Sequence, residues 1–328
     1  MTEKIDLLPS GQWGGYRLLV DGSLRQTGRL DPGACSPPMD LVAVAHDTLA
    51  ILARGEYVAP SGRTVELDLE RCVRESRTWS PEELADLSLE PRAGAPGTPR
   101  PEASLAGAGR LDAGPRGAPL PSAFVSVTEE TTGAAARRLA AEGPVAVLNF
   151  ASAVSVGGGF LRGAKAQEED LCRCSALFAC LEPQRGYYVA NRAAGSDLYT
   201  DRLITSPDVP FFRDERLGLL EAPFLASVIT APAPCARELR MEERLQLPSI
   251  FERRVANVLA VAEALGHRRL VLGAWGCGAF RNDPVLVADV FGRALEGSFR
   301  AAFERVDFAV YDPSPEQRNL SAFRARLS

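Results

Sequence analysis

The sequence predicts an α/β fold in which helices cover a central, largely parallel sheet. Over the last two thirds of the chain, short apolar runs typical of buried strands alternate with longer segments whose apolar residues have helical spacing. Two glycine-rich segments each follow an apolar run directly, as loops do at strand ends. This alternation favours parallel strands, because every parallel connection needs a crossover of about a dozen residues or more.

The first 90 residues contain shorter signals. Residues 14–28 predict a hairpin around Asp21-Gly22, a pair that tolerates the positive φ angles of a tight turn. Apolar spacing and capping residues predict three more elements: a helix over 39–54 that ends at Gly55, a strand over 63–69, and a helix that starts at Ser80-Pro81 with Glu83 at the capping-box position.

Residues 91–121 are rich in Pro, Gly, Ala and Arg, which predicts a flexible insertion. The remaining elements are expected in this order: helix 134–141, strand 145–152, helix 167–181, strand 187–191, strand 224–234, helix 246–265, strand 269–275, helix 284–303 and strand 306–312. The chain is thus expected to divide into an amino-terminal extension over 1–38, an accessory segment over 39–90 that packs on the core, the insertion over 91–121, and a core domain over 122–328.

Composition excludes several classes of protein. The 37 basic and 42 acidic residues leave no strongly basic field, so non-specific binding of nucleic acid is not expected. No apolar segment is long enough for a membrane span, and the first residues lack the pattern of a secretion signal. The seven cysteines are odd in number and lack a paired spacing pattern, and His46 and His267 are far in sequence from the C-x-C of Cys172 and Cys174. We therefore expect reduced thiols in a cytoplasmic protein without a metal site.

The first glycine-rich loop combines an anion-binding turn with two carboxylates. Gly157-Gly158-Gly159 lets backbone N–H groups approach a ligand without a Cβ in the way. Gln167-Glu168-Glu169 then begins a predicted helix, whose positive end points toward the same region. The spacing predicts a cradle for a diphosphate with carboxyl groups beside it.

The second glycine-rich loop spans residues 273–284. It offers further backbone donors and an aromatic side chain, Phe280, that can pack on a sugar or base. Asp283 and Pro284 are suited to cap and open the next helix. Neither loop ends in Gly-Lys-Ser/Thr, and the glycine order at 273–278 does not match the dinucleotide fingerprint.

Each of these features also has an ordinary structural explanation. A glycine-rich loop after a strand is often only a tight turn, and Glu168-Glu169 at a helix start also complements the helix dipole. A nucleophilic Cys277 would need a base, and no histidine is close in sequence. Other residues are expected to have structural roles: His267 as a helix C-terminal cap and Trp275 in the core. Arg253-Arg254 are expected on a solvated helix face, with the alternative that one of them reaches the cleft. Tyr199 and residues 206–210 are expected in a loop bordering the site.

Several motifs together resemble the bacterial branch of the poly(ADP-ribose) glycohydrolases. Besides the triple glycine and Gln-Glu-Glu, the similar segments are NFASA at 149–153, L-x-R-x-S-x-L at 171–177, SPDVPFFRD at 206–214, ITAPAP at 229–234 and GAWGCGAFRNDP at 273–284. The resemblance covers about 130–312 and extends to 40–70. Two departures bear on substrate preference: Ser155-Val156 stand where the family often has Asn-Pro, and Cys235 stands where it often has Asn.

The resemblance implies a macrodomain-like three-layer α/β/α sandwich with a mixed central sheet, holding ADP-ribose at the strand ends. It implies that Glu169 is the catalytic acid and that Glu168 binds ribose hydroxyls near the scissile bond. The residues expected to bind the ligand are Gly157, Gly158, Gly159, Gln167, Gly276, Cys277, Gly278, Ala279 and Phe280.

The expected reaction is hydrolysis of the ribose–ribose O-glycosidic bond of poly(ADP-ribose), with ADP-ribose as product and without a cofactor. Glycosidases that use two carboxylates place them at least about 5 Å apart across the sugar, so adjacent glutamates favour a single acid/base, Glu169. Two alternatives stay open: a hydrolase that removes single ADP-ribose units from protein or nucleic acid, and a macrodomain that binds ADP-ribose without cleaving it.

Overall fold

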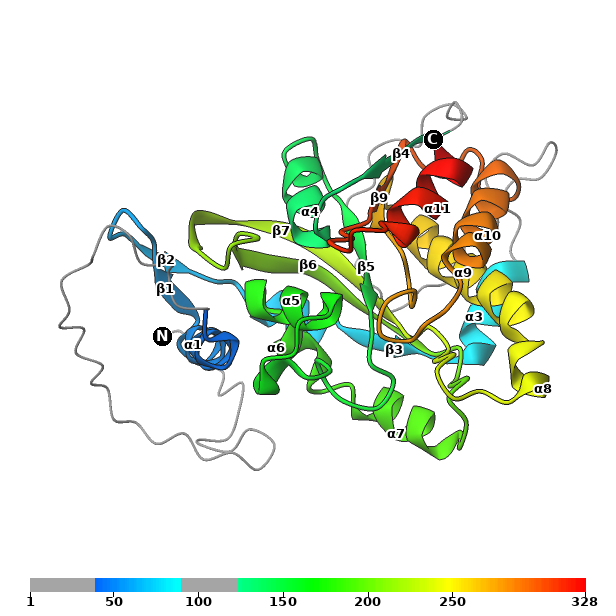
Figure 1. Ribbon diagram of the computed structural model, residues 1–328. Coiled ribbons are helices and arrows are strands. Elements are labelled where there is room, and N and C mark those ends of the chain that lie inside the picture. The colour runs from blue at the N-terminus through cyan, green and yellow to red at the C-terminus, as the bar shows by residue number, and fades with distance from the viewer. Residues whose placement is uncertain (1–38, 90–122) are drawn as a thin grey trace. The chain divides into compact units, whose positions relative to one another are not determined.

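A mixed seven-stranded sheet forms the centre of the computed structural model, which describes residues 39–89 and 123–328 (Figure 1). The hairpin expected at 14–28, the extension and the insertion at 91–121 lie outside the described residues. The strands lie in the order β3 (Arg77–Trp79), β6 (Leu203–Arg213), β7 (Leu219–Ala231), β5 (Ala146–Phe150), β8 (Arg269–Leu272), β9 (Arg305–Ala309) and β4 (Phe124–Thr128).

Five neighbouring strands, β7, β5, β8, β9 and β4, run in the same direction, whereas β6 pairs antiparallel with both β7 and β3. The prediction of a mixed central sheet is therefore confirmed. A separate two-stranded ribbon joins β1 (Glu56–Val58) to β2 (Thr64–Glu66). Of the two strands in this ribbon, β2 corresponds to the strand expected over 63–69. The sequence did not predict β1, β3 and β4, because three to five residues carry little periodicity.

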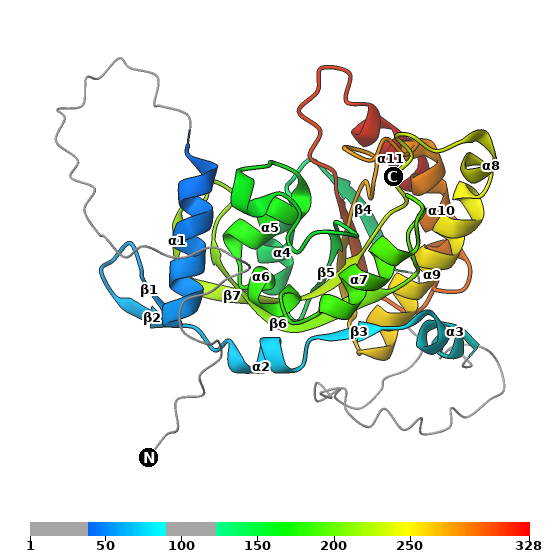
Figure 2. The same ribbon diagram turned by 90° about the horizontal axis from the view of Figure 1, so that it is seen from below.

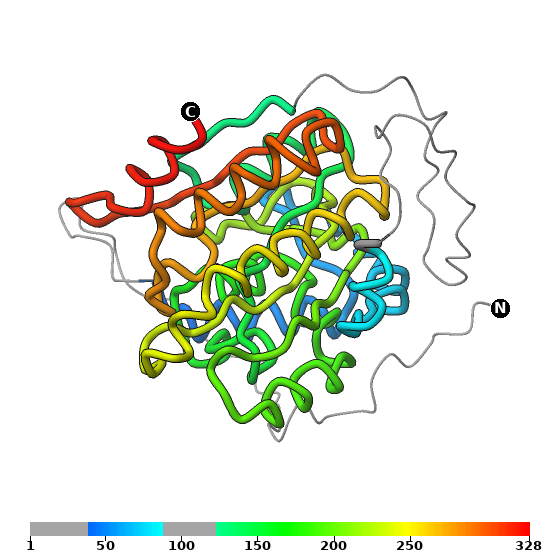
Figure 3. The backbone as a smooth tube through the Cα atoms, turned by 90° about the vertical axis from the view of Figure 1, so that its right-hand side faces the viewer, coloured from blue at the N-terminus to red at the C-terminus, as the bar shows by residue number. Residues whose placement is uncertain are grey.

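Helices cover both faces of the sheet. One face carries α4 (Thr132–Ala140), α5 (Gln167–Cys174) and α6 (Leu177–Leu181), and the other carries α9 (Leu247–Ala264), α10 (Pro284–Glu296) and α11 (Arg318–Leu327) (Figures 1 and 3). None of the helices in the described ranges is long and apolar enough to cross a membrane. The three-layer α/β/α arrangement agrees with the predicted fold class.

Alternating side chains of the central strands build the larger core. Leu148 of β5, Leu272 of β8 and Phe308 of β9 point to the face covered by α9 and α10, as the two-residue period of a strand requires. Trp275 is fully buried in this core and meets Phe251 edge to face with ring centroids 5.8 Å apart. The prediction that Trp275 is a core residue is therefore confirmed.

The amino-terminal elements largely follow the sequence signals. Helix α1 (Leu41–Arg54) ends at Gly55, whose φ of 71° is the left-handed conformation expected after a helix. Helix α3 (Pro81–Leu89) opens with the predicted capping box. The backbone N–H of Ser80 donates to Glu83 Oε2 at 2.7 Å, and the N–H of Glu83 donates to Ser80 Oγ at 3.3 Å.

Two stretches were assigned wrongly from the sequence. Residues 187–191 were expected to form a strand but belong to helix α7 (Arg185–Ala193), in which Tyr187 and Tyr188 are buried while Val189 is exposed. Five residues cannot separate a helix from a strand by period alone. Residues 206–210 were expected to form a loop but lie within β6, where the register shifts between Ser206 and Val209 and so accommodates a proline.

Two helices are shorter than expected. The segment 167–181 divides into α5 and α6 at Ser175, whose extended backbone breaks the helix and whose hydroxyl donates to Leu171 O at 2.7 Å. The helix expected over 284–303 ends at Glu296, before Gly297. Among the described residues, four helices were not predicted as helices from the sequence: α2 (Glu70–Arg74), α7, α8 (Met241–Arg244) and α11.

His267 follows the C-terminus of α9, as expected. Gly266, with φ 82°, donates its N–H to Glu263 O, and the His267 N–H reaches back to Ala262 O, both at 3.0 Å. This pair of bonds is the Schellman arrangement. The backbone of His267, and not its imidazole, therefore caps the helix. The imidazole is buried, and this burial lowers the pKa of His267 to about 4.

The parallel strands bring their carboxyl ends to one edge of the sheet. Gly273, the first residue after β8, packs so closely that a Cβ there would lie 2.5 Å from the carbonyl oxygen of Ala309 and 3.0 Å from Phe150 Cζ. The ends of β5, β8 and β9 therefore meet at this glycine. The loops that follow these strands emerge side by side at the edge where open α/β sheets bind ligands.

We expect Gly273→Ala to lower the free energy of unfolding by about 1–3 kcal/mol, because the added methyl group collides with the backbone carbonyl of Ala309 and crowds the Phe150 ring. Gly278→Ala is the matched control, since a Cβ at Gly278 meets no atom within 4 Å. Urea unfolding of both variants measures the difference, and equal stabilities would contradict the close packing at Gly273.

Candidate active site

The triple-glycine turn packs directly on the two glutamates of α5. Gly157 and Gly158 have φ angles of 60° and 58°, a backbone conformation that favours glycine. The N–H of Gly159 donates to Glu169 Oε1 at 2.7 Å. A Cβ at Gly158 would lie 2.4 Å from Glu169 Oε1 and 3.0 Å from Glu168 Oε2, so a side chain at this position would collide with both carboxyl groups.

Glu168 is buried and held by two donors. Its Oε2 accepts a hydrogen bond from the Ser152 N–H at 2.7 Å, and its Oε1 accepts one from Asn149 Nδ2 at 3.2 Å. Burial raises the pKa of Glu168 to about 8, although these two hydrogen bonds act in the opposite direction. Burial thus favours the neutral, protonated form of the Glu168 carboxyl group.

Glu169 lies beside Glu168 but in different surroundings. Its carboxyl group is anchored through Oε1 to the glycine turn, while Oε2 is buried and receives no hydrogen bond from the described residues. The residue is 7% exposed. One carboxyl oxygen is thus fixed by the backbone, and the other has its hydrogen-bonding capacity unused.

Gln167 ties the start of α5 to the end of β5. Its Oε1 accepts from the Phe150 N–H at 2.8 Å, and its Nε2 donates to Leu148 O at 2.8 Å and to Thr132 Oγ1 at 3.0 Å. The side-chain amide thus continues the hydrogen-bonding pattern of the strand edge. Contact of Gln167 with a ligand stays a prediction, whereas its observed bonds position the two glutamates that follow it.

The second glycine-rich loop is held against the loop that follows β7. Gly276 has a φ of 75°, and a Cβ there would lie 2.5 Å from Ala233 Cβ. Asn282 donates from Nδ2 to Pro234 O at 2.8 Å and to Gly276 O at 3.0 Å. Asn282 is buried and was not singled out from the sequence, since an asparagine before a helix cap is ordinary in any loop.

The outer part of this loop supplies an aromatic contact. Phe280 is half-buried, and its ring centroid lies 6.2 Å from that of Tyr199. Gly278 and Ala279 are exposed beside it. Asp283 caps α10 through a 3.0 Å bond from the Val285 N–H, as predicted.

Cys277 does not have the surroundings of a nucleophile. Its thiol donates to Trp275 O at 3.7 Å, and burial raises its pKa well above the usual range. A neutral thiol is a poor nucleophile. The structure therefore favours the packing explanation over the nucleophile hypothesis for Cys277.

The two loops predicted to share a ligand follow adjacent parallel strands. Strand β5 pairs with β8 on one side and with β7 on the other, so the segments after all three strands start from the same edge. The Ala151 N–H bonds to Ala231 O at 3.2 Å, and Trp275 Nε1 donates to the same oxygen at 3.2 Å. The start of the first loop and the start of the second thus share one acceptor.

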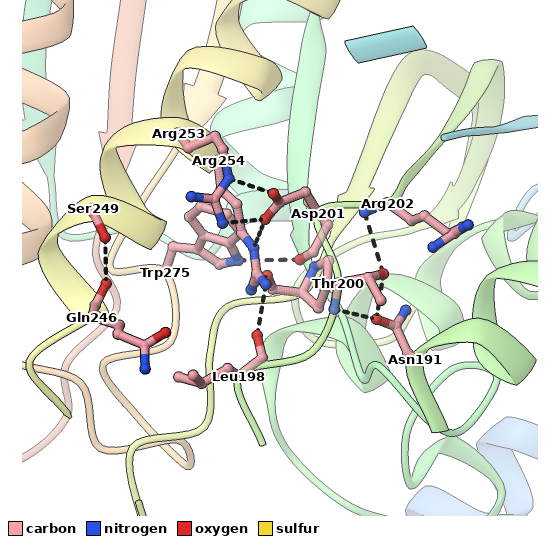
Figure 4. Close-up of polar contacts among 12 residues, drawn as sticks. Asn191, Leu198, Thr200, Asp201, Arg202, Gln246, Ser249, Arg253, Arg254 and Trp275 are labelled. Atoms are coloured by element: carbon pink, nitrogen blue, oxygen red, sulfur yellow. Dashed lines mark hydrogen bonds and ion pairs between the residues drawn. The ribbon is translucent and has the colours of Figure 1, made fainter. Parts of the chain in front are cut away.

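A buried arginine braces the segment that leads into β6 (Figure 4). Arg254 of α9 donates to Asp201 Oδ1 at 2.8 Å, to Pro232 O at 3.0 Å and to Leu198 O at 2.6 Å. Arg253 is exposed and pairs with the same aspartate. The prediction of a solvated face is therefore correct for Arg253 and wrong for Arg254, because a carboxylate and two carbonyl groups satisfy the buried guanidinium.

Helix α7 adds a second contact to the same segment. Asn191 Oδ1 accepts hydrogen bonds from both the N–H and the hydroxyl of Thr200 at 2.8 Å (Figure 4). Asn191 Nδ2 donates to Tyr187 O at 3.0 Å. Figure 2 shows α5, α6 and α7 between α1 and α9. Tyr187 and Tyr188 bury their hydroxyls without a partner among the described residues, and burial together with the charge of Glu168 raises the pKa of both.

The sheet, the paired glutamates and the glycine turns define a macrodomain-type glycosidase, and comparison with known proteins agrees. Residues 45–214 match the microbial-type poly(ADP-ribose) glycohydrolase (PARG) catalytic domain. The chain belongs to the microbial-type PARG family and acts as a glycosidase on poly(ADP-ribose). No curated protein matches the chain.

Solved structures of bacterial PARG resemble the chain over most of its length. The enzyme from Thermomonospora curvata is 43% identical, covers 87% of this chain and 98% of its own, and has a TM-score of 0.76. Its complex with the inhibitor ADP-HPD has 42% identity, the same coverage and a TM-score of 0.74. The Deinococcus radiodurans enzyme in complex with ADP-ribose is 43% identical, covers 80% of this chain and 98% of its own, and has a TM-score of 0.67.

The raised pKa of Glu168 predicts a pH-dependent stability. In the unfolded chain this carboxyl ionises near 4.5, whereas in the folded protein it ionises near 8. Between these values the unfolded state has released a proton that the folded state keeps. The free energy of unfolding therefore falls as pH rises, by at most about 1.4 kcal/mol per pH unit for this group.

Glu168→Gln removes this titration. Urea unfolding of wild type and variant between about pH 5 and 8 should show wild-type stability declining with pH relative to Glu168→Gln. Parallel stability curves over that window would show that the carboxyl is ionised in both states.

The two arginines of α9 provide a matched pair. Arg254→Met should lower the free energy of unfolding by about 3–5 kcal/mol, because two carbonyl groups and part of Asp201 lose a buried donor. Arg253→Met removes an exposed ion pair and should cost no more than about 1 kcal/mol. Denaturant unfolding measures both, and equal losses would contradict the bracing role of Arg254.

Proposed function

We propose that Glu169 is the general acid, and then the general base, in hydrolysis of the ribose–ribose O-glycosidic bond of poly(ADP-ribose). The observation that carries this proposal is the position of the Glu169 carboxyl against the Gly157–Gly159 turn, at the carboxyl ends of the parallel strands. Oε1 is anchored by a backbone amide, and Oε2 is the oxygen that lacks a hydrogen-bond partner among the described residues.

The reaction needs a proton at the bond that breaks. As the glycosidic C–O bond lengthens, positive charge develops on the distal ribose and negative charge on the departing oxygen. In the proposed step, Glu169 gives its proton to that oxygen, which leaves as the ribose hydroxyl of the next unit. The carboxylate then takes a proton from water as the water oxygen bonds to the anomeric carbon, and this regenerates the acid.

A single acid/base is consistent with the two different environments of the glutamates. Glu168 has both oxygens engaged by Ser152 and Asn149, so it is restrained in orientation. Its protonated form can donate a hydrogen bond to an oxygen of the distal ribose. The negative diphosphate of the substrate, held near the distal ribose, would stabilise the positive charge that develops there.

The glycine turns are proposed to hold the diphosphate of the terminal ADP-ribose unit through backbone N–H groups. Phe280 is proposed to pack on the ligand, with Tyr199 behind it. The Deinococcus radiodurans relative is in complex with ADP-ribose, which supports ADP-ribose as the product here. The proposal includes the cytoplasmic location expected from the cysteine pattern.

We expect Glu169→Gln to lower kcat on poly(ADP-ribose) by about 10²–10⁴-fold or more, because general acid–base help of that size is lost. The shape of the carboxamide preserves the acceptor for the Gly159 N–H, so the affinity for ADP-ribose should stay within about twofold of wild type. Product analysis by chromatography measures turnover, and titration calorimetry measures binding.

Turnover of Glu169→Gln close to the wild-type value would reject the assignment. Wild-type enzyme should be compared on the polymer, on mono-ADP-ribosylated protein and on mono-ADP-ribosylated DNA. Release of ADP-ribose from either single-unit substrate but not from the polymer would show a mono-ADP-ribosyl hydrolase instead.

A further inference from the structure

Two basic side chains without an ion-pair partner in the described part of the chain lie on the segment between the glycine turn and α5. Arg162 closes the short 3-10 turn η1 (Phe160–Arg162), and Lys165 lies shortly before α5. Both are exposed, and among the described residues neither side chain has a hydrogen-bond or ion-pair partner. Other arginines of the protein, such as Arg138 and Arg254, are engaged by carboxylates.

The Arg162 guanidinium and the Glu169 carboxyl group both lie close to Gly159. A Cβ at Gly159 would lie 3.5 Å from Glu169 Oε1 and 3.8 Å from Arg162 Nη2. The carboxyl group and the guanidinium therefore lie on the same side of Gly159. The turn itself is well supported. Gly163 ends it with a φ of 75°, and a Cβ there would lie 3.2 Å from Val42 Cγ2 of α1.

The chemistry of the polymer places an anion near this point. The oxygen that leaves is a hydroxyl of the adenosine ribose of the next unit, and the same ribose carries that unit's own diphosphate. A second pair of negative charges therefore arrives one sugar away from Glu169 on the leaving-group side. The chain has a net charge of −5, so overall charge does not attract this diphosphate and local donors have to hold it.

We propose that Arg162, assisted by Lys165, binds the diphosphate of the penultimate ADP-ribose unit and so selects polymer over a single unit. This inference rests on the proposed function of Glu169. A guanidinium suits the task, because its planar fork can donate two hydrogen bonds to one phosphate. Backbone amides of the glycine turns would hold the terminal diphosphate, and the two cations would hold the next.

The test compares Arg162→Ala, Arg162→Lys and Lys165→Ala with wild type. We expect Arg162→Ala to lower kcat/KM on long poly(ADP-ribose) roughly tenfold. The slope of log kcat/KM against log salt concentration should become less negative by about 0.7–1, because one phosphate contact is lost. Arg162→Lys should retain most of the salt dependence because it keeps the charge. The Kd for free ADP-ribose should stay within about twofold of wild type in all three variants.

Arg137→Ala is the matched control. Arg137 is an exposed arginine of α4 without a side-chain partner among the described residues, and α4 leads into the amino end of β5, away from the glycine loops. Its loss lowers the net charge equally and should change neither kcat/KM nor the salt slope.

Three outcomes would overturn the inference. Unchanged kcat/KM and salt slope in Arg162→Ala would show that the cations do not touch the polymer. A parallel loss of ADP-ribose affinity would place Arg162 on the terminal diphosphate instead. Absence of polymer cleavage by wild type would refute the proposed function and the inference with it, and the wild-type assay separates that case from the other two.

Discussion

The hydrogen bond from the Gly159 N–H to Glu169 Oε1 is the contact around which the site is arranged. It requires a backbone amide and a carboxyl group to meet at 2.7 Å, and this is feasible only where no Cβ intervenes. The left-handed glycines and the clash that any side chain at Gly158 would cause are consequences of that requirement. The same glycines leave their amide groups beside the carboxyl group. One turn can therefore both position Glu169 and bind the diphosphate of the proposed substrate.

The sheet supplies the second constraint. Because β7, β5 and β8 are parallel neighbours, three loops distant in sequence begin at one edge. Gln167 extends the hydrogen bonding of β5 into the first turn of α5, and Arg254 and Asn191 fix the segment that precedes β6. The functional residues are thus carried by strand ends and helix starts that both the sheet pairing and buried side-chain hydrogen bonds hold in place.

The glycines and the glutamates were predictable from sequence because they are local signals: consecutive glycines after a buried strand, then acidic residues at a helix start. Arg254, Asn282 and the tyrosines of α7 were missed because their roles arise from partners distant in the chain. Arg254 bonds Asp201, Leu198 and Pro232, none of which its own helix identifies. The error at 187–191 has a similar cause, since burial of Tyr187 and Tyr188 is decided by packing and not by the period of five residues.

The compactness of the first turn of α5 has a consequence for how the site loses order. Gln167, Glu168 and Glu169 are consecutive, so a shift of this turn breaks the tether to β5 and the bonds of both carboxyl groups together. Partial distortion that spares one glutamate is disfavoured by the geometry. The amide protons of Phe150, Ser152 and Gly159, each bonded to one of the three side chains, should exchange with solvent as a single cooperative group.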